Sequence, residues 1–441
     1  MDSLLDAAEA ASPVEAVEAV TRELGLALGA TRVSFLIADL SGRALVRLAH
    51  VRLDGDGDGD GDQRTAPLVL GERRTREESA TQVPFDGRLE EQVVRAQQVR
   101  VAAPDPSAAE PELHDSWRIL APVTARGEVI GLLEVVLPDD PGESTVGEIE
   151  RLAHLMAFVV IANRRHTDLF EWGQRTRPLS LSAEIQHRLL PGPQTCEAGA
   201  FVLGGWLEPA AGIAGDTFDF CLERDALHFS LTDAMGHGVA AALTATLCVG
   251  SLRNSRNAGS TLLEQLESTN AALADHAAKL GQEDFVTGLI GRVDLRTGLL
   301  QLVNAGHGAP YLVRGADVVP LDMPVDLPMG LFPDATYRAT GVALRPGDRI
   351  VFVTDGMLER NAAAADLVDG IRETRPLHPR EAVRMLADRV LEATGHELSD
   401  DATVLMLDWH GGHGRDRGSV HGADLARASS PAGQSPAVSV P

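Results

Sequence analysis

The chain has 441 residues, of which 44% are hydrophobic, so it is long enough for two or three domains with real cores. It carries 39 Lys and Arg against 64 Asp and Glu, and the resulting formal charge of −25 would repel nucleic acids and anionic membrane surfaces. No basic N-terminal segment leads into an apolar core, and no apolar run approaches the roughly 18 residues of a spanning helix. We therefore expect a cytoplasmic protein that binds neither nucleic acid nor membrane. Neither a disulfide framework nor a zinc site is indicated, because the three cysteines are scattered: Cys196, Cys221 and Cys248.

The first 165 residues alternate between helical and strand patterns. Apolar residues at helical spacing fill residues 1–30, and strands are expected at Arg32–Ala38 and Ala44–Leu53. This order predicts an α+β domain over residues 1–165, of the size of a sensory module. The further elements expected here are a strand at Leu68–Leu70, a helix at Gly87–Gln98, strands at Val99–Ala102, Arg118–Val123 and Val129–Leu137, and a long helix at Ser144–Arg165.

An acidic repeat, D-G-D-G-D-G-D-G-D, occupies residues 54–62. Counted from Asp54 as a calcium-binding loop, it places Gly59 correctly at position six but Thr65 at position twelve, where a bidentate Glu is needed. The repeat has no apolar side chain to bury, so we expect a mobile acidic hairpin tip.

The N-terminal pattern resembles a GAF domain over residues 10–165. The resemblance is carried by a first strand pair, a variable middle, a returning A-P-V-T-A-R-G-E-V-I-G-L-L-E-V-V hairpin and an exit helix. It implies a sensor domain with a regulatory pocket for a small molecule, without naming the ligand. The alternative is an interaction domain that holds no ligand.

Residues 166–193 are read as a helical linker between two domains. Pro178 cannot lie within an unkinked helix, so two helices are expected, the second at Ser182–Leu190. Connector helices of this kind often pair across a dimer, which makes the linker a candidate for homodimer contacts, although its apolar stripe is too short to predict a coiled coil.

Residues 194–410 show many short strands and a few longer helices, a pattern that indicates two sheets covered by helices. Residues 411–441 are rich in Gly, Ser, Ala and Pro without periodicity and are expected to be a disordered tail. The strands are expected at Phe201–Leu207, Thr217–Leu222, Leu227–Thr232, Phe285–Val293, Leu299–Ala305, Tyr311–Arg314, Arg349–Thr354 and Thr403–Trp409, and the helices at Val239–Arg253, Thr261–His276 and Pro379–Thr394.

Four acidic sites in this second domain lie at strand ends or beside glycines. They are Asp216 in A-G-D-T-F-D-F, Asp233 in L-T-D-A-M-G, Asp355 in V-F-V-T-D-G-M, and the pair Asp400 and Asp401 in L-S-D-D-A-T-V. Each alone reads as a cap or turn residue. Together they would repel one another unless divalent cations neutralised them, and all-oxygen ligands favour Mg²⁺ or Mn²⁺ over zinc.

The order of motifs resembles the protein phosphatase 2C superfamily, and within it the bacterial stage II sporulation protein E branch, over residues 182–409. The motifs are A-G-D-T-F-D-F, T-D-A-M-G-H-G-V-A-A-A-L, N-A-G-H-G-A-P, P-M-G-L, P-G-D-R-I-V-F-V-T-D-G-M-L-E and S-D-D-A-T-V. The resemblance implies an α-β-β-α sandwich that removes phosphate from Ser or Thr of a protein with two Mn²⁺ or Mg²⁺ ions.

The resemblance also implies residue roles. Asp233 would bridge both ions, Asp216 and the Ala234 carbonyl would complete one site, and Asp355 and Asp400 would complete the other. The family's phosphate-clamping arginine has no evident equivalent in this sequence. Two more acids are expected beside the ligands: Asp219 and Asp401.

Two histidines stand in glycine turns of these motifs: His237 in G-H-G and His307 in N-A-G-H-G-A-P. His237 could act as a general acid or orient a water, but we expect both histidines to shape the turns, because imidazole is a poor match for an all-oxygen site.

The sequence therefore predicts a sensor-regulated, metal-dependent phosphoserine or phosphothreonine protein phosphatase. The resemblance suggests a phosphorylated anti-sigma-factor antagonist as the substrate, in a partner-switching circuit. Two alternatives stay open: a catalytically silent phosphatase fold that serves as a sensor or binding module, and a hydrolase of small phosphate esters.

Overall fold

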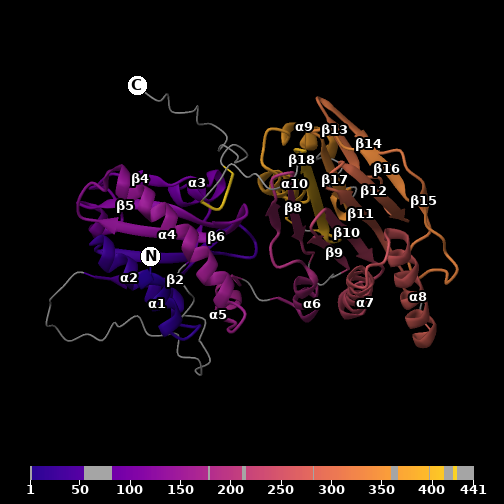
Figure 1. The fold of residues 1–441 in the computed structure, drawn as a ribbon, viewed down its shortest axis with the longest axis horizontal. Coiled ribbons are helices and arrows are strands. Elements are labelled where there is room, and N and C mark those ends of the chain that lie inside the picture. The colour runs from indigo at the N-terminus through magenta and orange to yellow at the C-terminus, as the bar shows by residue number, and fades with distance from the viewer. Residues whose placement is uncertain are drawn as a thin grey trace. The chain divides into compact units, whose positions relative to one another are not determined.

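The computed structural model describes residues 2–53, 82–176, 179–210, 215–281, 283–358, 366–396, 398–411 and 421–424. The chain divides into an N-terminal unit, residues 1–178 with 419–441, and a C-terminal unit, residues 179–418 (Figure 1). The acidic repeat at 54–62 and the strand expected at Leu68–Leu70 lie outside the described residues. Within the described part of the chain, no helix is long and apolar enough to cross a bilayer.

The N-terminal unit is built on an antiparallel sheet of six strands, in the order β3-β2-β1-β6-β5-β4 as far as the described residues show. The central pair, β1 and β6, is flanked by β2 and β5, so the first and last parts of the domain meet in the middle of the sheet. The strands are β1 (Arg32–Ala38), β2 (Ala44–Arg52), β3 (Gln82–Pro84), β4 (Arg100–Ala102), β5 (Trp117–Ala125) and β6 (Glu128–Leu137).

Alternation along β1 supplies both faces of this sheet. Val33 and Phe35 pack into the larger core, whereas Leu36 packs into a smaller cluster on the opposite face. The single helical run expected over residues 1–30 is two helices, since Pro13 stands in the turn between them. The larger core is covered by α1 (Asp2–Ala10), α2 (Ala16–Leu28), α4 (Gly142–Asn163) and α5 (Leu169–Gly173), and the smaller cluster by α3 (Leu89–Ala96).

The stretch expected as a linker, residues 166–193, is shared between the two units. Phe170 of α5 is buried in the N-terminal core, and the Gln174 carbonyl accepts from the Leu40 amide at 2.9 Å. The second helix, α6 (Leu181–Leu189), belongs to the C-terminal unit. It begins at Leu181 rather than at Ser182, because the hydroxyl of the N-cap residue Ser180 accepts from the Ala183 amide.

The expected disorder of the tail is wrong for residues 421–424, which pack within the N-terminal unit. The Gly422 carbonyl accepts from the Gly127 amide at 2.8 Å, and the next two residues are buried. The backbone hydrogen bond of Gly422 and the buried side chains of Ala423 and Asp424 hold this segment in place. The rest of the expected tail beyond Gly411 lies outside the described residues.

The C-terminal unit contains two sheets, each of six strands within the described chain. One runs β15-β12-β11-β10-β9 with β16 also on β12, and the other runs β14-β13-β17-β18-β8-β7. The strands are β7 (Thr195–Glu197), β8 (Phe201–Glu208), β9 (Asp216–Leu222), β10 (Ala226–Ala234), β11 (Val286–Asp294), β12 (Leu299–Ala305), β13 (Tyr311–Arg314), β14 (Asp317–Pro320), β15 (Val325–Asp326), β16 (Thr340–Ala343), β17 (Arg349–Val353) and β18 (Ala402–Trp409).

The two sheets pack face to face with helices outside them, which makes the expected α-β-β-α sandwich (Figure 1). The core between the sheets includes Phe218, Leu231 and Phe352. On the first sheet lie α7 (Gly238–Asn257) and α8 (Leu262–Leu280), and on the second lie α9 (Leu367–Glu373) and α10 (Pro379–Ala393).

Candidate functional site

Strand alternation turns two of the predicted acids into the space between the sheets. Asp216 lies two residues before Phe218 on β9, and Asp233 two residues after Leu231 on β10, so each shares the face of a residue in the core between the sheets. Asp216 and Asp233 are also direct cross-strand partners in the antiparallel pair. Directly opposite residues place their side chains side by side, so these two carboxylates form the base of the site.

Asp216 accepts hydrogen bonds from two hydroxyl groups of the second sheet. It is 2% exposed, and its Oδ2 accepts hydrogen bonds from the Thr354 hydroxyl at 2.7 Å and the Thr403 hydroxyl at 2.6 Å. Thr354 follows β17 and Thr403 lies on β18. Asp216 therefore joins the ends of both sheets and is held in one orientation.

The second sheet contributes its own acids at the same end. Asp355 follows β17 directly and is exposed, whereas Asp400 is half-buried and its Oδ1 accepts from the Asp401 amide at 2.8 Å. A side chain at Gly356 would overlap the Asp401 carbonyl, so only glycine allows the two loops to approach this closely. The glycine after Asp355 is thus a requirement of packing at the site.

The electrostatics of the acids show that they form one group. Burial, followed by the negative charge of Asp233, raises the pKa of Asp216 well above its usual value. Burial, followed by the charges of Asp355, Asp400 and Asp401, raises the pKa of Asp233 to about 7. Neighbouring carboxylates raise one another's pKa when too little positive charge lies near them to offset their mutual repulsion. A divalent cation would relieve that repulsion.

Asp401 is held by the protein itself. It is 1% exposed; its Oδ1 accepts from the Ala210 amide at 2.8 Å and its Oδ2 from the Gln186 side chain at 2.5 Å. Gln186 donates also to the Asp216 carbonyl at 2.9 Å. Asp401 is therefore a support for the neighbouring acids, as expected, and Gln186 of α6 is a site residue that the sequence reading missed.

A detectable signal for Gln186 does exist in the sequence. The buried residues of α6 are Ser182, Gln186 and Leu189, at helical spacing, so a glutamine stands in the middle of the buried stripe. A buried amide needs hydrogen-bond partners, and here those partners are Asp401 and the backbone of Asp216.

The Ala234 carbonyl, a predicted ligand, lies near the Asp233 carboxylate. The Ala234 amide donates to the Gly215 carbonyl at 3.1 Å, and a Cβ added to Gly215 would stand 2.5 Å from the Ala234 oxygen and 3.4 Å from Oδ1 of Asp233. Both oxygens thus crowd against the space left by a missing side chain. Gly236 at φ +95° and Gly238 at φ +73° then form the turn that leads into α7.

The chemistry of the predicted ligand atoms fits a hard cation. Every predicted ligand offers oxygen, the combination that Mg²⁺ and Mn²⁺ prefer. Among the residues described, however, no three His, Cys, Asp or Glu side chains are already arranged closely enough to hold a metal ion. Asp216, Asp233, Asp355 and Asp400 converge on one end of the sandwich without forming a closed coordination shell.

Contrary to the prediction, Asp219 does not lie beside these acids. It stands three residues after Asp216, so strand alternation turns it to the outer face of the sheet, towards α7. There it accepts from the Arg253 guanidinium at 2.9 and 3.1 Å and pairs with Arg256 at 3.4 Å. Arg253 also donates to the Leu189 carbonyl at 2.7 Å, so this acid anchors α6 and α7 to the sheet.

His307 has the structural role that was expected. It is 8% exposed; its Nε2 donates to the Val353 carbonyl at 3.1 Å and its Nδ1 lies 2.9 Å from the Thr287 hydroxyl. Burial lowers its pKa, although the Val353 bond and Asp355 act in the opposite direction. A neutral imidazole thus connects the two sheets beside the site. His237, by contrast, is exposed at the start of α7, where its side chain makes no capping hydrogen bond.

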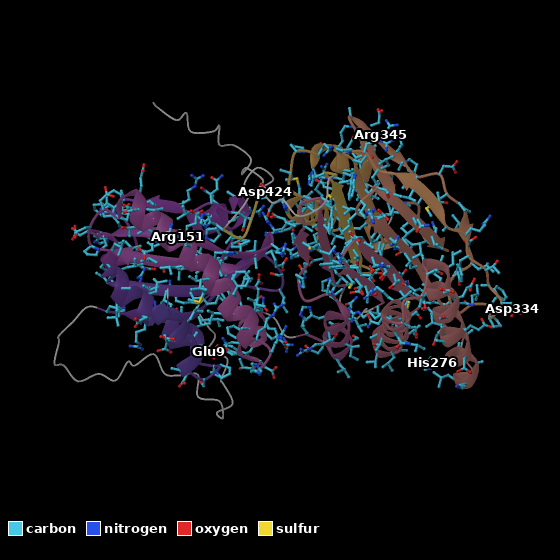
Figure 2. The ribbon with its side chains drawn as sticks, in the orientation of Figure 1. Glu9, Arg151, His276, Asp334, Arg345 and Asp424 are labelled. Carbon is cyan, nitrogen blue, oxygen red and sulfur yellow. The ribbon has the colours of Figure 1, made fainter. Side chains whose placement is uncertain are left out.

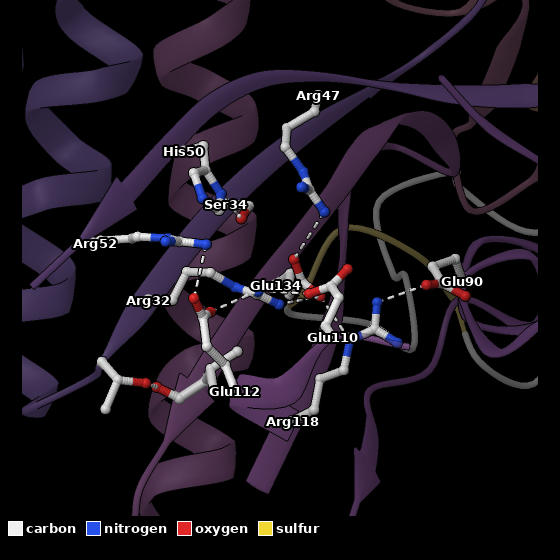
Figure 3. Close-up of polar contacts among 12 residues, drawn as sticks. Arg32, Ser34, Arg47, His50, Arg52, Glu90, Glu110, Glu112, Arg118 and Glu134 are labelled. Carbon is white, nitrogen blue, oxygen red and sulfur yellow. Dashed lines mark hydrogen bonds and ion pairs between the residues drawn. The ribbon is translucent and has the colours of Figure 1, made fainter. Parts of the chain in front are cut away.

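The N-terminal unit has a polar cluster of its own (Figure 3). Glu134 stands two residues after Leu132 on β6, so it shares the sheet face that α3 covers. At its centre Glu134 is almost fully buried. Burial alone would raise the pKa of Glu134, but Arg118, Arg32 and Arg47 outweigh it and hold that pKa below its usual value. The chain's own carboxylates and guanidiniums therefore pair on this face. The remaining partners are Glu90 for Arg118, and Glu110 and Glu112 for Arg32.

Two family models match the chain in this order. The model described as GAF domain matches residues 12–162, and the model described as Stage II sporulation protein E matches residues 223–410. Three of the four ligand candidates, Asp233, Asp355 and Asp400, fall inside the second match, and Asp216 precedes it. The chain thus joins an N-terminal GAF domain to a domain of the stage II sporulation protein E type.

Two curated relatives come from Bacillus subtilis. The phosphoserine phosphatase RsbU is 22% identical over 292 residues, which are 65% of this chain and 85% of RsbU. The phosphoserine phosphatase RsbP is 21% identical over 243 residues, 53% of this chain and 58% of RsbP. Among solved structures, the PP2C phosphatase domain of SpoIIE from the same organism is 18% identical, with a TM-score of 0.41, and the match covers 48% of this chain and 65% of that one.

Proposed function

We propose that this chain, which joins a GAF domain to a domain of the stage II sporulation protein E type, is a metal-dependent phosphatase acting on phosphoserine or phosphothreonine of a protein. The N-terminal domain is proposed to regulate that activity. The observation that carries the proposal is the convergence of Asp216, Asp233, Asp355 and Asp400 from two sheets onto one end of the sandwich, with the pKa of Asp233 raised to about 7. The similarity to two phosphoserine phosphatases supports the same reaction.

In this proposal Asp233 would contribute to the binding of both cations, Asp216 and the Ala234 carbonyl would hold one of them, and Asp355 and Asp400 would hold the other. Two bound Mn²⁺ or Mg²⁺ ions would supply an activated water and charge stabilisation for phosphoryl transfer. The chain's own part is positional: the Thr354 and Thr403 hydroxyls fix Asp216, as described above. Choosing between the two metals needs a direct measurement of affinity and rate.

For the substrate we propose a phosphorylated anti-sigma-factor antagonist in a partner-switching circuit, on the strength of the similarity to RsbU and RsbP. A small molecule bound by the GAF domain is the proposed signal. A cytoplasmic location and a homodimer formed through residues 166–193 remain predictions from the sequence. Purification followed by light scattering tests the second of these.

The test is hydrolysis of a phosphoserine protein and of a generic aryl phosphate by the full chain, with Mn²⁺, with Mg²⁺ and after chelation. Asp233→Ala and Asp355→Ala should lose activity at least about 100-fold, because each removes a ligand to the catalytic metals. Asp334→Ala, at an exposed position labelled in Figure 2, is the matched control and should keep wild-type activity.

Three outcomes distinguish the protein phosphatase from the two alternative functions. Metal-dependent activity that both site variants lose supports the proposal. If wild type and both variants are equally inactive with metal supplied, the silent sensor or binding module is correct. A clear preference for small metabolite esters over phosphopeptides would identify a small-ester hydrolase. Regulation by the GAF domain fails if the full chain and residues 179–411 have equal activity in every condition.

A further inference from the structure

A short segment close to the C-terminus, residues 421–424, is bound to the GAF domain although it follows the phosphatase-like domain in the chain. We call these residues the docking segment. The carbonyl of Gly422 accepts from the amide of Gly127 at 2.8 Å. Ala423 and Asp424, the latter labelled in Figure 2, are 4% and 5% exposed. A bonded backbone at Gly422 and two buried residues after it indicate that the segment occupies a specific site.

The receiving surface is the tight turn between β5 and β6 together with α4. Arg126 at φ +51° and Gly127 at φ +78° form the turn, and the amide of Gly127 points away from the hairpin ladder. The ladder register shifts between Val123 and Thr124, and the Thr124 carbonyl accepts instead from Nδ1 of His154 on α4, at 2.9 Å. The Gly127 amide would need water at this place, and the docking segment supplies a carbonyl.

The fit admits only glycine at the centre of the segment. Gly422 has φ +98°, a conformation that side chains disfavour. A Cβ added there would overlap the Thr124 carbonyl and lie 2.9 Å from Nδ1 of His154. The segment therefore lies against both the hairpin and the exit helix of the GAF domain.

Burial of Asp424 points to specificity as well. Carboxylates are rarely buried to 5% exposure without fixed polar surroundings, because removing the charge from water is costly. A tail that merely collapsed onto the surface would bury its apolar residues and leave an aspartate in water. Here Asp424 is buried next to Ala423, as in a folded interface.

We propose that residues 421–424 are an intramolecular ligand of the GAF domain, and that the turn at residues 124–127 together with His154 is its binding site. Residue 411 ends the described part of the C-terminal unit, so ten peptide steps separate it from His421, a reach of at most about 35 Å. Because the segment is covalently part of the chain that it binds, a free peptide must compete with it at an effective concentration of about millimolar. The docking segment thus belongs to the N-terminal unit, although the whole C-terminal unit precedes it in the chain.

The docking segment also lies against α4, the helix that leads out of the GAF domain. A change at the β5–β6 turn or at His154 would release the segment, and release of the segment would free the same surface for another peptide of similar sequence. This inference does not depend on the proposed enzymatic activity, so it can fail or hold independently of it.

Hydrogen exchange measured by mass spectrometry tests the proposal on the full chain, a chain that ends at Gly411, and the variant Gly422→Ala. Amides of residues 124–130, which include Gly127, should exchange at least about tenfold faster in the last two proteins. Gly87→Ala is the matched control: Gly87 also has positive φ, +84°, but an added Cβ meets nothing within 4 Å. It should leave exchange at residues 124–130 unchanged.

A peptide of residues 417–428 added to the chain that ends at Gly411 should restore protection, whereas the same peptide with Gly422→Ala should not. Exchange at β1 reports whether each variant is folded. Equal exchange at residues 124–130 in all four proteins overturns the proposal. It is also overturned if protection is lost but the wild-type peptide, at millimolar concentration, restores no more of it than the altered peptide does.

Discussion

Replacing Asp233 by asparagine should stabilise the metal-free protein, although it removes the proposed central ligand. In the metal-free state Asp233 faces the charges of Asp355, Asp400 and Asp401 and is largely buried, which raises its pKa from the usual 3.8 to about 7. The folded protein thus binds this proton more tightly than the unfolded chain does. Stability is therefore lost as pH rises from the unfolded pKa towards the folded one, and asparagine removes that loss.

The magnitude follows from the difference between the two pKa values. About three pH units correspond to about 4 kcal/mol of unfolding free energy above pH 7, of which somewhat more than half, about 3 kcal/mol, develops between pH 5 and pH 8. Asp233 is only partly shielded from water, so screening reduces the value that is measured. We expect the advantage of Asp233→Asn over wild type to grow by about 1–3 kcal/mol from pH 5 to pH 8.

The assay is urea unfolding of chelator-treated protein at both pH values, followed by tryptophan fluorescence, to which Trp206 and Trp409 of the C-terminal unit contribute. Asp334→Asn, at an exposed position, is the control and should track wild type. With Mn²⁺ at about 100 times its dissociation constant, wild type should gain about 2.7 kcal/mol and Asp233→Asn much less. An advantage for the asparagine variant that stays the same or shrinks at pH 8 would refute the reasoning from carboxylate repulsion.

Three further changes test other contacts. Gly215→Ala should weaken Mn²⁺ binding about 10–100-fold by calorimetry, since its Cβ would displace the proposed carbonyl ligand, whereas Gly250→Ala in α7, where an added Cβ meets nothing within 4 Å, should not. Gln186→Ala should cost about 1–3 kcal/mol in urea unfolding because it strips donors from buried acceptors, and an unchanged midpoint would contradict the role assigned to α6. Glu134→Gln should cost the N-terminal unit about 1–3 kcal/mol, because it removes the one fully buried counter-charge shared by Arg32 and Arg118 and leaves them only more exposed carboxylates, whereas exposed Glu143→Gln should cost almost nothing. Since the pKa of Glu134 is lowered, its contribution is present at neutral pH and lost as pH falls through the folded pKa, which acid unfolding of the two proteins will show.

The sequence predicts most of this fold where periodicity is strong. The expected strand Arg32–Ala38 has those bounds in the structure, and the long helix expected at Ser144–Arg165 spans Gly142–Asn163. Short edge strands such as β14 and β15 were missed, because their residues are mostly exposed and carry no alternation of buried and exposed positions. The single helix expected over residues 1–30 shows the opposite error. The helical spacing of apolar residues continues past Pro13, but the structure has a turn there between two helices.

The same alternation determines which of the predicted acids face the space between the two sheets. Asp216 and Asp219 stand in one motif, yet an interval of three residues in a strand sends them to opposite faces. A motif names both acids, and only the strand period assigns one to the site and the other to Arg253. The docking segment had no such signal, since a short H-G-A-D sequence within a Gly- and Ala-rich tail reads as disorder until its binding surface is known.

Gln186 joins the site to the element that follows the boundary between the two units. The C-terminal unit begins at Leu179, and α6 is its first helix. One side chain of that helix donates to Asp401 and to the backbone of Asp216, so a displacement of α6 by about an ångström would stretch both bonds beyond useful length. Asp216 and Asp401 would then lose part of what orients them. Metal affinity should therefore depend on the position of α6, and Gln186 gives this chain a physical route by which events before residue 179 can reach the carboxylates.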